Sequence, residues 1–193
     1  MLSNIKKRIF PEPLNKNYND LKYDSEGLWS ITHHKEADLI SKKILEYSDI
    51  NAHIVDATAG CGGNLISFNK YFNNITGIEL VLDRFIIMKN NLKQYTNNNI
   101  TLINDDCLNY ICDNNYDIYF FDPPWGGPNY KTEKNLELYL SKNNIIDVIK
   151  KIEKNKLIIL KIPYNYNINK ISIYFTILEQ IEIGNMTILI FKN

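Results

Sequence analysis

The stretch that decides the fold is Val55-Asp56-Ala57-Thr58-Ala59-Gly60-Cys61-Gly62-Gly63-Asn64. Residues 53–56 predict a short buried strand, and residues 64–72 predict a helix. Glycine carries no Cβ, so the glycines of this turn let the backbone approach a ligand closely. In open α/β sheets, ligands bind outside the carboxyl ends of the strands, where this turn would lie. The stretch therefore predicts both a strand–turn–helix unit and a binding site.

Short strands and helices alternate on both sides of this turn. We expect further strands at residues 75–79, 100–104, 118–122 and 157–161, helices at 82–95 and 145–154, and an earlier helix capped by Thr32. Residues 177–183 and 187–191 predict a closing hairpin across Gly184 and Asn185. Strands that alternate with helices form a mostly parallel sheet covered on both faces. The sequence thus predicts a Rossmann-like α/β fold with a seven-stranded, mostly parallel sheet and a terminal antiparallel hairpin.

The length of 193 residues predicts a single domain with one substantial core. Residues 1–28 are largely polar, contain Pro11 and Pro13, and show no clear period. We therefore divide the chain into an N-terminal arm at residues 1–31, which would pack over the active site, and a main domain at residues 32–193.

Charge and composition exclude several classes of protein. Lysine and arginine total 22 against 22 aspartate and glutamate, so a net charge of zero gives no general attraction for nucleic acid, and any such contact must be local. The longest apolar run is far shorter than the ~20 residues of a membrane span, so we expect a soluble intracellular protein, in the cytoplasm or nucleus, with no membrane partner. The three cysteines form no Cys-x-x-Cys pair, which predicts reduced thiols and no metal site.

An acidic residue at the end of the second strand points to a nucleoside ligand. Glu79 lies 19 positions after Gly60 (79 minus 60), where its carboxylate can accept from both ribose hydroxyls of S-adenosylmethionine or of NAD. Two details favour S-adenosylmethionine: Leu65 stands where a dinucleotide site needs a small residue, and Asp56 could meet a cationic methionine group. Asp106 could bind the adenine amino group. The expected cofactor residues are Asp56, Thr58, Ala59, Gly60, Gly62, Gly63, Asn64, Glu79, Leu80, Asp106, Cys107 and Asp122.

A second motif, Asp122-Pro123-Pro124-Trp125, follows the fourth predicted strand. Successive prolines force the residues before them into extended geometry, so the carbonyls of Asp122 and Pro123 leave the hydrogen bonds of the strand. Such carbonyls can accept from an amine, and the ring of Trp125 can stack on a planar base. The motif is similar to that of amino-methyltransferases acting on exocyclic or amide nitrogens. The predicted catalytic residues are therefore Asp122, Pro123, Pro124 and Trp125.

Together these motifs resemble the trimethylguanosine synthase family of RNA cap methyltransferases over about residues 20–190. Four segments carry the resemblance: Asp24-x-Glu26-Gly27-x-Trp29-Ser30-x-Thr32, residues 56–64, Trp125-Gly126-Gly127-Pro128-x-Tyr130, and Ile162-Pro163-x-Asn165. The resemblance implies a class I methyltransferase fold and S-adenosylmethionine as cofactor. It also implies a 7-methylguanosine-capped RNA or cap analogue as substrate, methylated at the guanine N2 to 2,7-dimethylguanosine, and a second methylation there would give 2,2,7-trimethylguanosine.

The resemblance further implies roles for individual residues. Trp125 would stack on the cationic 7-methylguanine ring, while Asp122 and Pro123 would receive the N2 hydrogens. Thr32 and Phe10 would belong to the arm that closes over the cofactor. The residues expected to contact the cap are Ser30, Trp125, Tyr130, Tyr164 and Asn165.

Two positions depart from the family pattern. Asp122 stands where family members often carry serine, which adds a carboxylate beside the amine. Tyr164 stands where an arginine commonly meets the cap phosphates. Basic residues of the arm are candidate replacements for that arginine, namely Lys6, Lys7 and Arg8.

Two other interpretations stay open on the sequence alone. One is an adenine or cytosine amino-methyltransferase on DNA or RNA, whose usual aromatic at the position of Trp125 is tyrosine or phenylalanine. The other is a cap-binding module without catalysis, although a pure binder need not keep the loop at residues 60–64. The sequence does not indicate whether one or two methyl groups are added, or which RNA is the natural substrate. We expect a monomer with no obligatory protein partner.

Overall fold

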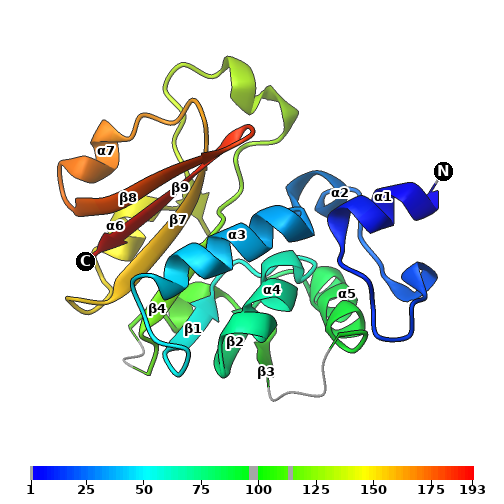
Figure 1. Cartoon of the computed structure of the whole chain (residues 1–193). Helices are drawn as coiled ribbons and strands as arrows, with labels where there is room; N and C mark the ends of the chain where they lie inside the picture. Colours follow the sequence, from blue (N-terminus) through cyan, green and yellow to red (C-terminus); the bar gives the residue numbers. More distant parts are fainter. Residues whose placement is uncertain (1, 96–99, 113–114) are drawn as a thin grey trace.

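The computed structural model describes residues 2–95, 100–112 and 115–193 and centres on one seven-stranded sheet. Its strands are β1 (His53–Asp56), β2 (Asn74–Ile78), β3 (Ile100–Ile103), β4 (Ile118–Phe121), β7 (Leu157–Pro163), β8 (Thr176–Ile183) and β9 (Met186–Lys192). They lie in the order β3-β2-β1-β4-β7-β9-β8. The first five pair in parallel, and β9 is antiparallel to both β7 and β8, which confirms the predicted sheet and hairpin (Figure 1).

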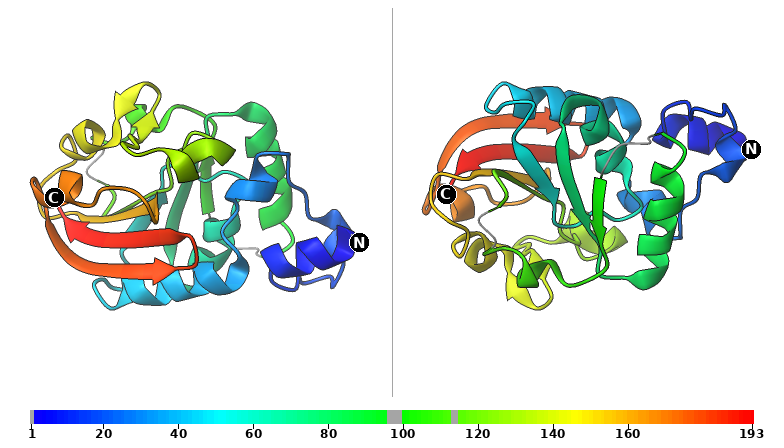
Figure 2. Two further views of the ribbon diagram at one scale, coloured as in Figure 1. Left: turned by 90° about the horizontal axis from the view of Figure 1, so that it is seen from above. Right: turned by 90° about the horizontal axis from the view of Figure 1, so that it is seen from below.

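Helices cover both faces of this sheet (Figures 1 and 2). On one face lie α3 (His34–Leu45), α4 (Gly63–Tyr71) and α5 (Leu82–Leu92), and on the other lie α6 (Ile145–Ile149) and α7 (Asn169–Ser172). Successive strand residues point to opposite faces, so neighbours enter different cores. Phe120, for example, packs in the cluster with α3 and α4, whereas Phe121 packs in the cluster with α6 and α7.

The order of the strands places both sequence motifs together. Strands β4 and β7 are buried along their full length, because they lie in the middle of the sheet. The chain runs outward in one direction from β1 to β2 and β3, and in the other direction from β4 to β7. Ligands bind outside the carboxyl ends of the strands at such a reversal. The glycine-rich turn after β1 and the Asp122 motif after β4 both lie there.

The sequence of the N-terminal arm showed no clear period, but the arm contains regular structure. It contains α1 (Leu2–Ile9), a 3₁₀ turn η1 (Tyr18–Asp20) and α2 (Gly27–Ser30). The apolar residues Leu2, Ile5 and Ile9 do repeat at helical spacing, but two prolines soon after them obscured the pattern. Ile9 and Phe10 are buried in the cluster with α3 and α4, so the arm contributes to the core.

The predicted helices were too long at their ends. The helix predicted at residues 82–95 is α5, which stops at Leu92, and the helix predicted at residues 145–154 is α6, which stops at Ile149. Thr32 does not cap α3: the cap position is His33, whose side chain makes no capping hydrogen bond. A short pair of strands, β5 (Tyr139–Leu140) and β6 (Asn143–Asn144), was not predicted. Within the described residues, no helix is long and apolar enough to cross a membrane.

Candidate active site at the carboxyl edge of the sheet

The glycine-rich turn is shaped by contacts within the chain. Gly60 and Gly62 have φ of +55° and +90°, a conformation that favours glycine. A Cβ on Gly63 would lie 2.8 Å from the Ile31 side chain and 3.3 Å from the Thr32 carbonyl oxygen. The glycines were expected to make room for a ligand. In the structure, Gly63 makes room for the chain between α2 and α3, which brings this segment against the turn.

Asp56 presents an unused acceptor beneath this turn. It is fully buried, and its Oδ1 accepts from the Thr58 backbone N–H at 3.1 Å, while Oδ2 has no partner among the described residues. Burial raises the pKa of this carboxyl to about 8, and the nearby carboxylates of Asp122 and Glu79 add to the effect. The Oδ1 of Asn64 is also buried without a partner in the described part of the chain. Unpaired acceptors beside a cluster of acids suit a cationic ligand group.

Glu79 is fixed at the end of β2 by two backbone groups. Its two oxygens accept from the N–H groups of Gly60 and Val81, each at 2.8 Å. The guanidinium of Arg84 lies 4.0 Å from it and makes ion pairs with Asp24 and Glu26 in the arm, at 3.1 and 2.6 Å. The carboxylate is therefore held at the sheet edge, in the place expected for a ribose acceptor.

The residues after β2 and β3 lie at the same edge. Leu80 is 58% exposed directly after Glu79. Asp106 accepts from the Leu108 N–H at 3.0 Å and caps the 3₁₀ turn η2 (Cys107–Asn109). Cys107 is buried, which raises the pKa of its thiol to about 12 and keeps it protonated. Cys107 is thus suited to lining a site and not to nucleophilic chemistry.

The Asp122 motif forms a loop against the glycine-rich turn. The Asp122 N–H donates to the Thr58 hydroxyl at 2.7 Å, and its carboxylate Oδ2 accepts from Lys161 at 2.6 Å. Among the described residues, the carbonyl oxygens of Asp122 and Pro123 accept no hydrogen bond. Both carbonyls are therefore available to an amine, as the two prolines predicted.

Trp125 follows the two prolines directly in the chain and packs edge-to-face on Tyr130, with ring centroids 5.2 Å apart. Tyr130 in turn contacts Asn165: the Asn165 side-chain amide donates to the Tyr130 carbonyl oxygen at 2.8 Å. Tyr130 belongs to the 3₁₀ turn η3 (Pro128–Thr132). Tyr164, in contrast, is 54% exposed. The structure thus links Trp125, Tyr130 and Asn165, and leaves Tyr164 at the surface.

The predicted arm residues lie in different surroundings. Ser30 is exposed, whereas Thr32 is buried and its hydroxyl accepts from Lys161 at 3.0 Å. Phe10 is fully buried in the apolar core. Lys161, which joins Thr32 to Asp122, was missed by the sequence analysis. The signal for it was present, because it is the one charged residue in the otherwise apolar strand β7.

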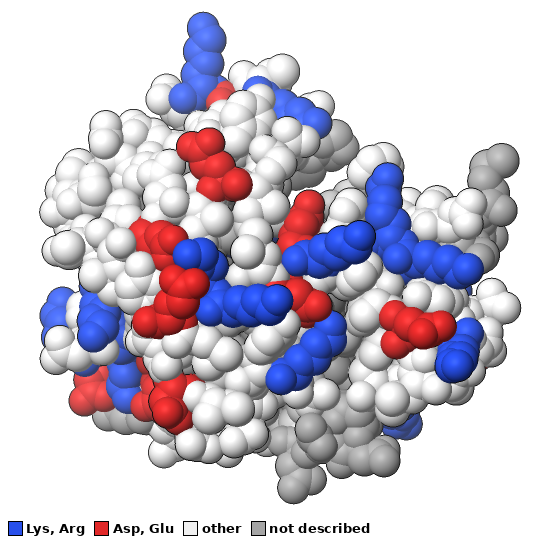
Figure 3. Space-filling model, in the orientation of Figure 1, with Lys and Arg blue, Asp and Glu red and all other residues white. Residues whose placement is uncertain are grey.

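A basic pocket adjoins the start of α3. It has a volume of about 240 Å³ and is lined by Lys7, Arg8, His33, His34, Lys35 and Glu36. Lysine and arginine side chains gather on this side of the molecule, where α1 meets α3 (Figure 3). His33, which lines the pocket, follows Thr32 directly, and Thr32 shares the Lys161 ammonium group with Asp122. The candidate phosphate contacts Lys7 and Arg8 lie in it, but Lys6 does not line it and instead reaches the Asn19 carbonyl oxygen.

Comparison with protein families finds that residues 51–190 match the model of RNA cap guanine-N2 methyltransferases. The chain is 32% identical over 225 aligned residues to an uncharacterised protein of Acanthamoeba polyphaga mimivirus, covering 99% of this chain and 86% of that protein. It is 33% identical over 130 residues to the trimethylguanosine synthase of Schizosaccharomyces pombe, covering 60% of this chain and 54% of the relative. The Saccharomyces cerevisiae trimethylguanosine synthase is 26% identical over 163 residues, covering 78% of this chain and 51% of the relative. The chain matches about half the length of these two yeast proteins.

Solved structures share the fold. The tRNA methyltransferase TrmI from Aquifex aeolicus superposes with a TM-score of 0.63 at 15% identity, covering 90% of this chain and 72% of that one. A putative methyltransferase, yhhF, from Escherichia coli superposes with a TM-score of 0.56 at 15% identity, covering 81% of this chain and 84% of that one. At these identities the likeness supports a class I methyltransferase architecture and carries no information on the substrate.

Proposed function

Because the chain belongs to the RNA cap guanine-N2 methyltransferase family, we propose that it methylates the exocyclic N2 of 7-methylguanosine in an RNA cap, using S-adenosylmethionine. The first product is 2,7-dimethylguanosine, and a second transfer to the same nitrogen would give 2,2,7-trimethylguanosine. The observation that carries the proposal is the loop after β4, in which the carbonyl oxygens of Asp122 and Pro123 accept no hydrogen bond within the described residues and Trp125 follows them in the chain.

The residues at the edge of β1, β2 and β3 fit the cofactor. Asp56 offers an unpaired, buried oxygen to a cationic group, Glu79 offers a fixed carboxylate to the ribose, and Asp106 lies near the end of β3 for the adenine amino group. When bound, S-adenosylmethionine supplies the electrophilic methyl group, and the electrons of the broken C–S bond stay on sulfur as the new N–C bond forms. No nucleophilic side chain is needed for such a direct transfer.

The acceptor side of the reaction depends on Asp122, Pro123 and Trp125. The N2 lone pair of guanine is delocalised into the ring, which makes it a poor nucleophile. Two acceptors aimed at the N2 hydrogens localise the lone pair as the nitrogen becomes pyramidal, and the carboxylate of Asp122 can take the proton that leaves nitrogen. An indole ring suits a cationic 7-methylguanine, because the ring face carries negative charge density.

The basic pocket supports a phosphate-bearing substrate. Tyr164 supplies no positive charge where the family commonly has an arginine. A single pocket, in contrast, holds three positively charged side chains, those of Lys7, Arg8 and Lys35. Cationic side chains attract phosphate strongly at low salt and less at high salt. We assign the phosphate bridge of the cap to this pocket.

The function is tested by methyl transfer from labelled S-adenosylmethionine to four acceptors: 7-methyl-GTP, 7-methylguanosine nucleoside, unmethylated GTP and a DNA oligonucleotide. We expect transfer to 7-methyl-GTP, weaker transfer to the nucleoside because it lacks phosphates, and little to the other two. Product mass counts the methyl groups. Transfer to DNA alone, or equally to GTP and 7-methyl-GTP, would contradict the proposal and favour a different amino-methyltransferase.

Cofactor binding should depend on pH through Asp56. The pKa of this carboxyl in the free protein is about 8, so it is protonated at neutral pH, whereas a cationic ligand favours its ionised form. Below pH 8, binding should therefore release a proton, and the affinity should rise with pH by at most about tenfold per unit. Isothermal titration calorimetry in two buffers of different ionisation enthalpy measures this proton. The Asp56→Asn protein should show no such dependence, and a pH-independent wild-type affinity would refute the assignment.

A further inference from the structure

Lys161 is a buried lysine that the contacts proposed above do not require. Only 4% of its surface is exposed, and every other residue of its strand, β7, is apolar. Burial of an ammonium group is unfavourable unless the charge is paired. The position would be filled more easily by an aliphatic side chain, so the charge itself calls for an explanation.

Three segments of the chain meet at the Lys161 ammonium group. Its Nζ donates to Asp122 Oδ2 at 2.6 Å and to the Thr32 hydroxyl at 3.0 Å, and it lies 3.5 Å from the Ser30 carbonyl oxygen. It also lies 5.4 Å from the centroid of the Trp125 ring. Lys161 therefore connects β7 with the loop after β4 and with the segment that leads from the arm into α3.

The ion pair leaves one oxygen of Asp122 unused. Lys161 holds Oδ2, and no hydrogen bond to Oδ1 is made within the described ranges. The backbone of the same residue is fixed separately, through its N–H and the Thr58 hydroxyl. A carboxylate that is held through its backbone and through one oxygen presents its other oxygen in a defined direction.

We infer that Lys161 is a positioning residue of the acceptor site, which aims the free oxygen of Asp122 at the exocyclic amine and locks the Ser30–Thr32 segment against it. The inference rests on the proposed role of Asp122 as amine acceptor. Lys161 acts through Asp122 and Thr32, so its loss should slow turnover without weakening the contacts of the cofactor at Asp56 and Glu79.

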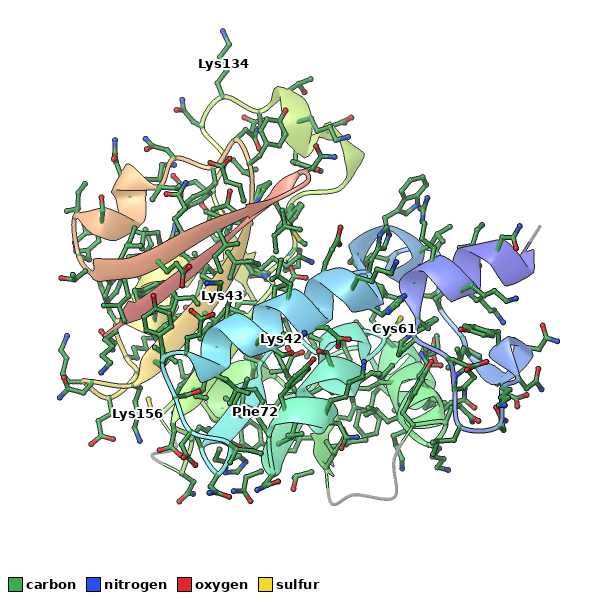
Figure 4. The ribbon with its side chains drawn as sticks, in the orientation of Figure 1. Lys42, Lys43, Cys61, Phe72, Lys134 and Lys156 are labelled. Atoms are coloured by element: carbon green, nitrogen blue, oxygen red, sulfur yellow. The ribbon has the colours of Figure 1, made fainter. Side chains whose placement is uncertain are left out.

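The chain offers a matched control lysine at the other end of the same strand pair. Lys156 precedes β7 and lies 3.8 Å from Asp117, which precedes β4, just as Lys161 pairs with Asp122 after β4. Figure 4 labels Lys156 near the start of β7, whereas Lys161 lies toward its other end. The comparison of Lys161→Met with Lys156→Met therefore separates the acceptor site from the general loss of a lysine–aspartate pair.

For Lys161→Met we expect kcat to fall about 100-fold, the loss that a misplacement of about 1 Å can cause, and KM for S-adenosylmethionine to change much less than kcat. Amide hydrogen exchange in the segment from α2 to the start of α3 should become faster, because that segment loses its tie to β7. Lys156→Met should change neither quantity. An unchanged kcat and unchanged exchange in Lys161→Met would overturn the inference.

A double variant separates positioning from stability. Lys161→Met alone leaves a buried carboxylate unpaired and should lower the melting temperature, whereas Lys161→Met with Asp122→Asn removes both charges and should restore it. The double variant should stay slow, and recovery of kcat together with stability would overturn the inference. Hydrogen exchange needs no substrate, so it tests whether Lys161 holds the Ser30–Thr32 segment even if the wild-type protein fails to methylate 7-methyl-GTP. Such a failure would contradict only the proposed function.

Discussion

Replacement of Trp125 by alanine should lower kcat/KM for 7-methyl-GTP by about 100-fold, because base stacking on an aromatic ring contributes about 1–3 kcal/mol and the positive charge of the base adds to it. The residual activity should no longer distinguish 7-methyl-GTP from GTP, since the preference for a cationic ring is attributed to the indole. The measurement is a comparison of both acceptors at saturating S-adenosylmethionine.

The second tryptophan makes the Trp125 experiment sharper. Trp29 is 85% exposed and is the only other tryptophan in the chain. In a Trp29→Phe background, Trp125 is the sole tryptophan, so quenching of its fluorescence by 7-methyl-GTP reports stacking directly. Strong quenching is expected with 7-methyl-GTP and weak quenching with GTP. A Trp125→Ala protein that keeps full activity, or equal quenching by both nucleotides, would argue against stacking.

Replacement of Glu79 by alanine should weaken S-adenosylmethionine binding by at least about 100-fold, because hydrogen bonds to a charged group contribute about 1.5–3 kcal/mol each. The ribose offers two hydroxyls to this carboxylate. Calorimetry gives the dissociation constant, and Asp83→Ala provides a control, since Asp83 is an exposed acid in the first turn of α5.

Glu79 also holds the Gly60 N–H, so a loss of affinity could come from a loosened turn and not from the ribose. A ligand without ribose hydroxyls distinguishes the two causes. If Glu79 binds the hydroxyls, the deoxygenated ligand should bind wild type weakly and lose little more in Glu79→Ala. An equal loss for both ligands would assign the effect to the turn.

The fold could be predicted because its signals are local. The strands at β1 and β4 are short apolar runs, each followed by glycines or prolines that end it, and such patterns need no knowledge of distant contacts. The hairpin of β8 and β9 was equally readable from Gly184 and Asn185. Helix ends were less readable, as Leu92 and Ile149 illustrate, because packing decides where a helix stops.

The site was only partly predictable for a related reason. Within the described residues the carbonyls of Asp122 and Pro123 accept no hydrogen bond, and this follows from proline geometry, which is a property of adjacent residues. The partner of Asp122 is Lys161, which lies 39 positions away and becomes its neighbour only when β4 and β7 pair. Thr32 was misassigned as a cap because its hydroxyl is used by that same distant lysine. Contacts that depend on strand pairing cannot be read from spacing.

The pairing of β4 with β7 carries a consequence for how the chain reaches this fold. Ile118 lies opposite Leu157 and Phe121 lies opposite Leu160, so one lysine–aspartate pair brackets each end of the alignment. A slip by a single residue would exchange the side chains that enter the two cores and separate both pairs at once. Because β4 and β7 consist mainly of similar large apolar residues, few other side-chain contacts distinguish the correct alignment of the two strands from a shifted one. The charges at the two ends should therefore destabilise misaligned pairings during folding, and the Lys161–Asp122 ion pair also fixes the loop after β4.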